Sequence, residues 1–306
     1  MTMTAHAWED KAVAALEGRP GVGLLRDIPL SDHTYIGIGG PARVLIEPET
    51  VKDLAWAITR LHQEQVPFDV LGAGSNLLVA DEGPSFVVVS CAGLGDVPIV
   101  EGTGVRASAG FSVPRLTQRL QKAGLAGIEF AEGIPGSVGG AVKMNAGWHE
   151  GEFGAHVRSL IVVTRHGDIE RLDCSPGFFE YRKSPGLGDA IVAEATLELT
   201  PDNPARIAER MRGFRDHRVK SQPTGERNAG CMFKNPQGDA AGRLIDQSGL
   251  KGTRVGAAEV SPIHANFFIN LGGATSRDVR SLIDMVRERV RQATGVLLEP
   301  EVMLWT

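Results

Sequence analysis

The segment from Glu132 to Gly147 carries few side chains, and four of the eight residues 133–140 are glycine. The chain as a whole has 38 glycines among 306 residues. Ordering such a bare main chain costs much conformational entropy and contributes little to a hydrophobic core. A flexible linker fits badly, because Ile134, Pro135 and Val138 stiffen the segment. A bound planar or polyanionic ligand would offset the cost, so we expect this segment to contact a ligand.

The first of two glycine loops, Gly72-Ala-Gly-Ser-Asn-Leu77, follows an apolar stretch at 68–71, and residues 133–140 form the second glycine loop. A dinucleotide-binding fingerprint would need glycine where Leu77 stands and a helix after it, whereas residues 77–79 are typical of extended chain. No Gly-Lys-Ser/Thr ends any glycine run, which excludes a phosphate loop of the NTPase type. Two interpretations stay open: an anion site formed by backbone N–H groups with Ser75 and Asn76, or an ordinary tight connection between strands.

Composition narrows the class of protein. The length and a hydrophobic content of 42% indicate two or three globular units. The net charge of −5 gives no basic field for nucleic acid or an anionic membrane surface. Three scattered cysteines predict neither a metal site nor disulfides and fit a reducing compartment. No secretory signal and no apolar run of about 18 residues is visible, so we expect a soluble, cytoplasmic protein.

Periodicity and turn residues predict an α+β fold in three units. Helices are expected after caps at Thr50 and Ser112, the latter ending at Gly124, and from Ser276 onward. Further helices are expected at 205–218, which is basic, and at 241–248. Strands are expected at 42–47, 68–71, 77–79, 97–100, 104–109, 157–164, 169–174, 190–199 and 267–270, with a closing extended segment at 297–305. The predicted division is 1–90, 91–219, 220–298 and a C-terminal strand at 299–306 that returns to the active site.

The two glycine loops, VLGAGSNLL at 70–78 and GIPGSVGG at 133–140, together resemble the FAD-cradling loops of the vanillyl-alcohol-oxidase-like (PCMH-type) flavoproteins. Five further motifs follow in order: YRKS from Tyr181, KSQP from Lys220, NAGCMFKNP from Asn228, LIDQSGLKG from Leu244 and LEPEV from Leu298. The ordered set, from about residue 34 to residue 304, is similar to the UDP-N-acetylenolpyruvoylglucosamine reductases, the MurB family. The short spacing between Arg182 and Lys220 matches the subtype that lacks an extra tyrosine-bearing loop.

This resemblance implies a three-unit FAD-binding fold followed by a C-terminal α+β substrate domain. It implies FAD as cofactor, NADPH as reductant, a nucleotide sugar of peptidoglycan precursor synthesis as substrate, and action as a monomer without nucleic-acid or membrane partners. FAD would be held noncovalently, because residues 68–80 contain neither His nor Cys. The cofactor contacts it implies are Gly72, Gly74, Ser75, Asn76, Leu77, Gly133, Ile134, Pro135, Gly136, Ser137, Gly140 and Ala141.

The family transfers hydride from NADPH to FAD, and then from flavin N5 to the methylene carbon of an enolpyruvyl ether. This second transfer drives negative charge into the neighbouring carboxylate. The resemblance assigns Arg182 to grip that carboxylate and a protonated Glu301 to donate a hydrogen bond beside it. It assigns Cys231, which stands where the family usually has serine, to protonate the adjacent carbon; thiols, at a pKa of ~8.5, are stronger acids than hydroxyls. The structural alternatives are a surface arginine, a solvated glutamate and a small core thiol.

Substrate recognition is expected to draw on the basic segment 204–220, one side of which is apolar and packed. The resemblance implies that Lys220 contacts the UDP diphosphate and that Asn235 and His264 line the nucleotide-sugar site. His264 taken alone would more often be structural. The segment 145–151 differs from the usual Ala-Tyr-Gly continuation of the family, and Met232 replaces a usual phenylalanine.

Two other functions remain to be weighed. An oxygen-using flavin oxidase would often tether FAD through a histidine near the first loop, and none is present there. A nucleotide-sugar-binding regulator without turnover is compatible with the glycine loops. The combination of Arg182, Cys231 and Glu301 argues against it.

Overall fold

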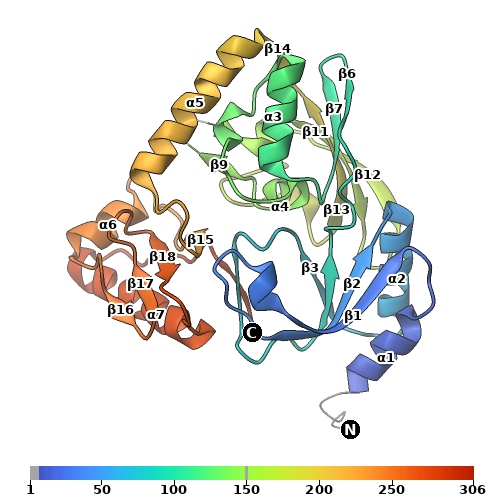
Figure 1. The fold of residues 1–306 in the computed structure, drawn as a ribbon, viewed down its shortest axis with the longest axis horizontal. Helices are drawn as coiled ribbons and strands as arrows, with labels where there is room; N and C mark the ends of the chain where they lie inside the picture. The colour runs from blue at the N-terminus through green and yellow to red at the C-terminus, as the bar shows by residue number, and fades with distance from the viewer. Residues whose placement is uncertain (1–6, 149–150) are drawn as a thin grey trace. The chain divides into compact units, whose positions relative to one another are not determined.

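The computed structural model describes residues 7–148 and 151–306. The chain divides into two compact units that interleave along the sequence. The first unit comprises the residues up to Asp27, Arg43–Ala73 and Phe86–Asp216. The second unit comprises Ile28–Ala42, Gly74–Ser85 and His217–Thr306. Figure 1 shows both units, coloured along the chain.

A four-stranded sheet organises the N-terminal part of the first unit. Its order is β1 (Val22–Pro29), β2 (Pro41–Pro48), β5 (Val87–Ser90) and β3 (Phe68–Leu71), and β5 is parallel to both β2 and β3. The helices of this part are α1 (Ala7–Leu16) and α2 (Val51–Gln63). Thr50 caps α2 by accepting a hydrogen bond from the Asp53 amide at 3.1 Å. The apolar face of α2, with Leu54, Ile58 and Leu61 fully buried, then packs into the core.

A five-stranded antiparallel sheet forms the rest of the first unit. Its order is β12 (Ile169–Asp173), β11 (Val157–Val163), β13 (Ile191–Glu198), β7 (Gly104–Ser108) and β6 (Ile99–Glu101). The two faces of β11 bury different cores, because successive side chains of a strand point to opposite faces. Leu160 and Val162 join the core that includes α3 (Val113–Ala123) and α4 (Val138–Lys143), whereas Val163 joins the core of α2. Figure 1 shows α3 and α4 beside this sheet.

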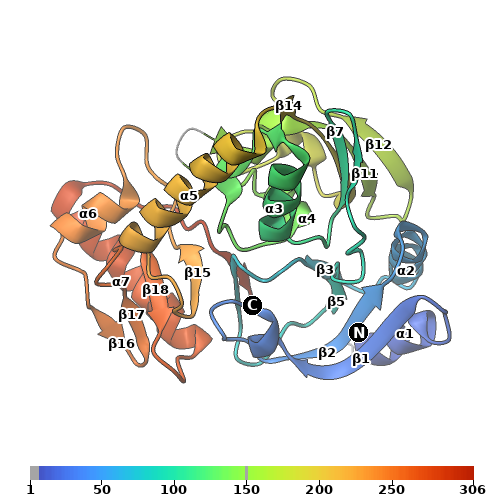
Figure 2. The same cartoon turned by 45° about the horizontal axis from the view of Figure 1, so that its top comes forward.

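The second unit is built on a four-stranded sheet and two helices (Figure 2). The sheet order is β15 (Asn228–Cys231), β18 (Phe267–Asn270), β17 (Ala258–Val260) and β16 (Arg254–Val255). The helices are α6 (Ala241–Gln247) and α7 (Ser276–Thr294); a Thr275–Asp278 capping box starts α7. In the same unit β4 (Leu77–Val79) pairs in parallel with β19 (Met303–Trp305), so the C-terminal strand lies against the end of the first glycine loop.

The long helix α5 (Pro204–Ser221) begins in the first unit and ends in the second. The remaining elements are short. They are η1 (Leu30–His33), β8 (Leu125–Ala126), η2 (Glu129–Ala131), β9 (Gly147–Trp148), β10 (Gly151–Glu152), η3 (Phe153–His156), η4 (Pro185–Leu187) and β14 (Thr200–Pro201).

The structure contains the helices expected after Thr50 and Ser112, at 205–218, at 241–248 and from Ser276, and strands at each expected position. One cap differs: Ser112 occupies the N-cap position of α3, but its side chain makes no capping hydrogen bond. The sequence did not predict α1, or that residues 28–42 and 74–85 leave the first unit for the second. The division at residues 90, 219 and 298 stays a prediction. Among the described residues, no helix combines the length and the apolar character needed to span a bilayer.

Replacing Phe268 by Ala is expected to destabilise the second unit by about 3–5 kcal/mol, because the ring is fully buried and packs edge-on against Phe233 at 6.0 Å. Urea unfolding measures this change. Leu271→Ala is the control, since Leu271 follows the same strand but is 48% exposed. Equal losses for the two variants would show that Phe268 does not organise this core.

Candidate flavin and substrate site

The glycine segment 133–140 is held by hydrogen bonds of its own main chain. The Val113 amide donates to the Gly136 carbonyl at 3.0 Å, and the Val138 amide donates to the Phe111 carbonyl at 2.9 Å. The Gly139 amide donates to the Ala109 carbonyl at 2.8 Å. A Cβ on Gly139 would lie 2.9 Å from the Cβ of Ala109, so this contact requires glycine. The segment is therefore an ordered loop and no flexible linker.

Ser137 presents an unsatisfied hydroxyl in this loop. The side chain is only 4% exposed, and its Oγ has no hydrogen-bond partner within the part of the chain that the structure describes. It stands at the N-cap position of α4 without capping it. A Cβ on Gly72, at the start of the other glycine loop, would lie 2.9 Å from this Oγ. A buried hydroxyl beside bare backbone can bind an anionic or polar ligand, which would supply the missing partner.

The rest of the predicted cofactor set lies on the same two loops. Gly133 has a φ of +74°, which favours glycine, and Ile134, Pro135 and Gly136 follow it half-buried. Gly140 and Ala141 lie within the first turns of α4. Gly133, Gly136 and Gly140 have no side chain, so a ligand at these positions would meet the main chain.

The first glycine loop makes a tight connection. Gly74 has a φ of +67°, and a Cβ there would collide with the His33 carbonyl, so the close approach requires glycine. Asn76 donates from Nδ2 to the Glu301 carbonyl at 3.1 Å, and its own carbonyl accepts from the Met303 amide at 3.0 Å. Leu77 is buried in the β4–β19 pair, and Ser75 is half-buried. The loop thus connects two strands and also anchors the C-terminal segment. Backbone groups of the loop that are not used in these contacts can bind a ligand.

Cys231 and Glu301 are brought together in the second unit. Cys231 ends β15, and the Glu301 amide donates to the carbonyl of the next residue, Met232, at 2.8 Å. Phe233 and Pro300 form an antiparallel bridge directly beyond it. The backbones of two chain segments about 70 residues apart therefore pair here, one carrying the Cys231 thiol and the other the Glu301 carboxyl group, and the Asn76 side chain bonds to the Glu301 carbonyl.

Arg182 lies in the first unit on a two-residue turn. The Glu180 and Lys183 backbones exchange hydrogen bonds of 2.9 and 3.1 Å, which leaves Tyr181 and Arg182 at the tip. Arg182 has a φ of +58°, in a region that residues with a Cβ rarely enter. Its guanidinium lies 4.9 Å from the centre of the Tyr181 ring. The turn presents a permanently charged group on a constrained backbone.

The predicted substrate contacts all lie in the second unit. Lys220 is exposed near the end of α5. The Asn235 Oδ1 accepts from the Ala241 amide at 3.0 Å, at the start of α6. His264 accepts from the Asn266 amide at Nδ1, and burial lowers its pKa from the ordinary value of 6.5, so the imidazole is neutral at pH 7. Nε2 then carries the proton and can donate a hydrogen bond.

Two arginines of the basic helix α5 have structural partners. Arg210 donates to Glu129 at 2.6 Å and to Asp202 at 2.7 Å, and Arg215 pairs with Glu132. Both glutamates are buried just before the second glycine loop. Their carboxylates need these cations, because an unpaired buried charge is costly. This part of the segment 204–220 therefore supports the loop.

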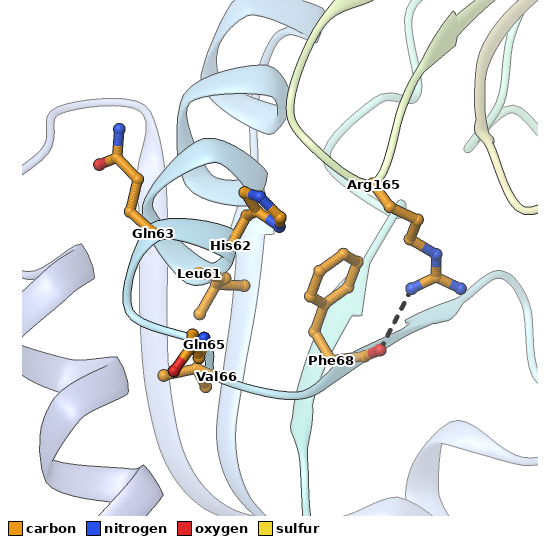
Figure 3. Close-up of a pocket in the computed structure, with 7 residues that line it drawn as sticks. All are labelled: Leu61, His62, Gln63, Gln65, Val66, Phe68 and Arg165. Carbon is orange, nitrogen blue, oxygen red and sulfur yellow. Dashed lines mark hydrogen bonds between the residues drawn. The ribbon is translucent and has the colours of Figure 1, made fainter.

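A cavity of about 580 Å³ opens elsewhere in the first unit, between the end of α2 and β3 (Figure 3). Arg165 is the cation in its lining, and Figure 3 shows its guanidinium bonded to the Phe68 carbonyl, at 3.2 Å. It also donates to the Asp189 carbonyl and stacks on the Phe68 ring. These contacts give Arg165 a structural role. No residue that the sequence predicts to bind cofactor or substrate lines the cavity. Its lining residues are Leu61, His62, Gln63, Gln65, Val66, Phe68 and Arg165.

Comparisons with known proteins match two regions of the chain. Residues 42–173 match the FAD binding domain model, and residues 222–305 match the C-terminal domain model of UDP-N-acetylenolpyruvoylglucosamine reductase. The chain is 44% identical to UDP-N-acetylenolpyruvoylglucosamine reductase 2 of Symbiobacterium thermophilum, over 90% of both chains. It is 42% identical to the reductase of Geobacter metallireducens, over 96% of this chain and 98% of that one. This chain belongs to the UDP-N-acetylenolpyruvoylglucosamine reductase family.

A solved structure of the family has the same fold. The crystal structure of UDP-N-acetylenolpyruvylglucosamine reductase (MurB) from Thermus caldophilus matches with a TM-score of 0.80 at 39% identity, covering 93% of this chain and all of that one. The expected α+β flavoprotein fold and the FAD-dependent oxidoreductase class are thereby confirmed. The residues present fit FAD, because the buried Ser137 hydroxyl has no partner among the described residues and lies beside Gly72 of the first glycine loop.

Sequence reasoning missed the buried amides that support the site. Asn266 is 2% exposed, and its side chain both donates to the Phe233 carbonyl at 2.8 Å and accepts from the Phe233 amide at 3.0 Å. It therefore fixes the strand that carries Cys231. Asn145 plays a similar part near Arg182. Asn145 belongs to the side-chain-poor stretch and to the atypical segment 145–151, but neither pattern indicates a supporting role; His149 and Glu150 of that segment lie outside the described residues.

The protein is expected to lose stability as the pH falls below about 7. Burial lowers the pKa of both His156 and His264 beneath 6.5, so the unfolded chain binds more protons than the folded protein in the window just below that value. The free energy of unfolding therefore decreases as the pH falls. Thermal unfolding between pH 7.5 and 5.5 measures this effect, and the double variant His156→Gln/His264→Asn should show a shallower fall. An unchanged slope would exclude these two imidazoles as its source.

Proposed function

We propose that this chain uses NADPH and bound FAD to reduce the enolpyruvyl ether of UDP-N-acetylglucosamine to UDP-N-acetylmuramate, and that Arg182, Glu301 and Cys231 carry the chemistry. The observation that carries the assignment is the bond between the Glu301 amide and the Met232 carbonyl, which places the carboxyl-bearing residue beside the thiol-bearing strand. FAD, when bound, supplies the hydride-transfer chemistry. The residues of the chain must bind the substrate, stabilise the charge that develops and deliver a proton.

Arg182 binds the substrate carboxylate in this proposal. Adding hydride to the methylene carbon spreads negative charge into that carboxylate. A guanidinium can grip both of its oxygens and stays charged at every working pH. The constrained turn supports this role, because a preorganised cation needs little reordering when charge develops.

Glu301 donates a hydrogen bond to the same developing charge from its protonated carboxyl group. Two hydrogen bonds that fix the backbone of Glu301 support this role. Its amide donates to the Met232 carbonyl, and its carbonyl accepts from the Asn76 side chain. Cys231 then gives its proton to the carbon next to the carboxylate: the S–H bond breaks, a C–H bond forms, and solvent reprotonates the thiolate. Lys220, Asn235 and the Nε2–H of His264 bind the nucleotide sugar.

The other two functions make different demands. A flavin oxidase would need no acid near the substrate, and a binding protein would need no thiol beside a carboxyl group. The proposal includes action on small molecules alone, in the cytoplasm, as a monomer.

Replacing Ser137 by Ala is expected to weaken FAD binding by about 10- to 100-fold, the effect of losing a hydrogen bond to a charged group. Flavin fluorescence titration of the apoprotein measures the affinity. Ser112→Ala is the matched control, because Ser112 is the bridge partner of Ser137 on the neighbouring segment and is less buried. Equal affinities for both variants and wild type would remove Ser137 from the cofactor site.

One assay tests the function. Protein, FAD and NADPH are mixed with and without the enolpyruvyl nucleotide sugar, and NADPH consumption is followed. Consumption that requires the sugar supports the reductase, consumption with oxygen alone supports an oxidase, and none supports a binding protein. In the same assay, split into half-reactions, Glu301→Gln should keep reduction by NADPH and lose roughly 10²-fold or more in reduction of the sugar.

Two results would change the residue roles. An equal loss in both half-reactions of Glu301→Gln would remove Glu301 from the second step. Unchanged product formation by Cys231→Ala would remove the thiol as proton donor.

A further inference from the structure

The Arg182 turn needs support from outside itself. Its backbone sits in the left-handed region at φ +58°, which a residue with a Cβ occupies only when surrounding contacts hold it there. The Glu180–Lys183 hydrogen bonds close the turn, and a 2.6 Å ion pair between the same two side chains lies largely in solvent, where it contributes little. The turn must therefore be fixed by its buried contacts.

Asn145 supplies the most buried of these contacts. The residue is fully buried, and its side chain uses both ends. Nδ2 donates to the Glu180 carbonyl and to the Glu152 carboxylate, each at 2.9 Å, and Oδ1 accepts from the Gly154 amide at 2.8 Å. Asn145 itself has a φ of +41°, which asparagine tolerates better than most residues. Its amide thus joins the base of the turn to the β10–η3 segment.

A second anchor lies at the other end of the turn. Ser184 is buried, and its hydroxyl donates to the Val142 carbonyl at 2.6 Å. Val142 and Asn145 lie at and just beyond the end of α4, and α4 begins directly after Ser137. The turn is therefore bonded at both ends to the short helix that continues the second glycine loop.

The guanidinium itself lies against the same segment. A Cβ placed on Gly147 would lie 3.3 Å from Arg182 Nη1 and 3.1 Å from the Glu152 Cγ. The stretch from Asn145 to Gly147 thus lies against the turn in two places. Asn145 bonds to the backbone of the turn, and Gly147 lies beside the Arg182 guanidinium. Displacing Asn145 would move both.

We infer that Asn145 is a positioning residue that holds Arg182 in place for the substrate carboxylate, with Ser184 as a second anchor. The inference rests on the proposed function. It adds that the orientation of Arg182 is set from the end of α4, the helix that continues the second glycine loop. The amide must donate, because its two acceptors are a carbonyl and a carboxylate. An isosteric acid at this position would keep the bond from Gly154 and lose both donations.

The test uses Asn145→Asp in the FAD-loaded protein. Sugar reduction is expected to fall about 10²-fold, the cost of a misplacement of roughly 1 Å, while flavin reduction by NADPH stays within about twofold. Binding of two probes to the oxidised enzyme gives a second readout: affinity for the enolpyruvyl sugar should fall about tenfold, while affinity for UDP-N-acetylglucosamine, which lacks the carboxylate, is kept. In an Arg182→Gln background the Asn145→Asp change should add little, because the two residues act as one unit.

Ser184→Ala keeps the inference testable if Asn145→Asp does not fold, and it should show the same pattern at smaller size. Its matched control is Ser90→Ala, since Ser90 is also a buried serine, and its hydroxyl donates to the Glu47 carboxylate in β2. Equal losses in both half-reactions, an unchanged ratio of the two affinities, or full additivity with Arg182→Gln would each overturn the inference while wild-type turnover upholds the proposed function. A wild-type protein that consumes no NADPH with the sugar would overturn both.

Discussion

The main chain of the second glycine loop is the constraint on which the site depends. Burial of Val138 in the core orders this loop together with backbone hydrogen bonds to residues 109–113 and a glycine–alanine contact at Gly139 that leaves no room for a Cβ. In the same loop the Ser137 hydroxyl is buried and unsatisfied among the described residues. The loop thus has hydrogen bonds of its own main chain and, among the described residues, one buried hydroxyl that a ligand can satisfy.

Several features of the first unit serve to hold that loop. The buried carboxylates of Glu129 and Glu132 precede it, and each is neutralised by an arginine of α5. The helix α4 begins inside it at Val138, and the buried side chain of Asn145, just beyond the end of that helix, bonds to the turn of Arg182. Charge pairing on one side and amide hydrogen bonding on the other therefore make the glycine loop part of a continuous rigid structure. In the second unit, hydrogen bonds from the Asn266 side chain to the Phe233 backbone likewise fix the strand that carries Cys231.

Local pattern was sufficient for most of the secondary structure. Apolar spacing and the Thr50 cap predicted α2, and the spacing of three and four residues between the apolar positions of α7 predicted its buried face. One local prediction failed: Ser112 has the right residue type and position for a cap, yet its hydroxyl does not cap α3. For the site, the glycine loops and motifs identified the residues but not their supports. Asn145 bonds to a carbonyl 35 positions away, and no periodicity or spacing announces a partner at that distance.

The sequence by itself determined the local elements, the two bare loops and, through the order of its motifs, the family. These depend on side-chain spacing and backbone preference, which are properties of neighbouring residues. Only the tertiary structure decided that residues 74–85 join the second unit, that the C-terminal strand pairs with the end of the first loop, and that Asn76 holds the backbone of Glu301 across 225 positions. Such pairings are selected by the burial and hydrogen-bond satisfaction of the whole fold, because each polar backbone group must find a partner wherever the chain places it.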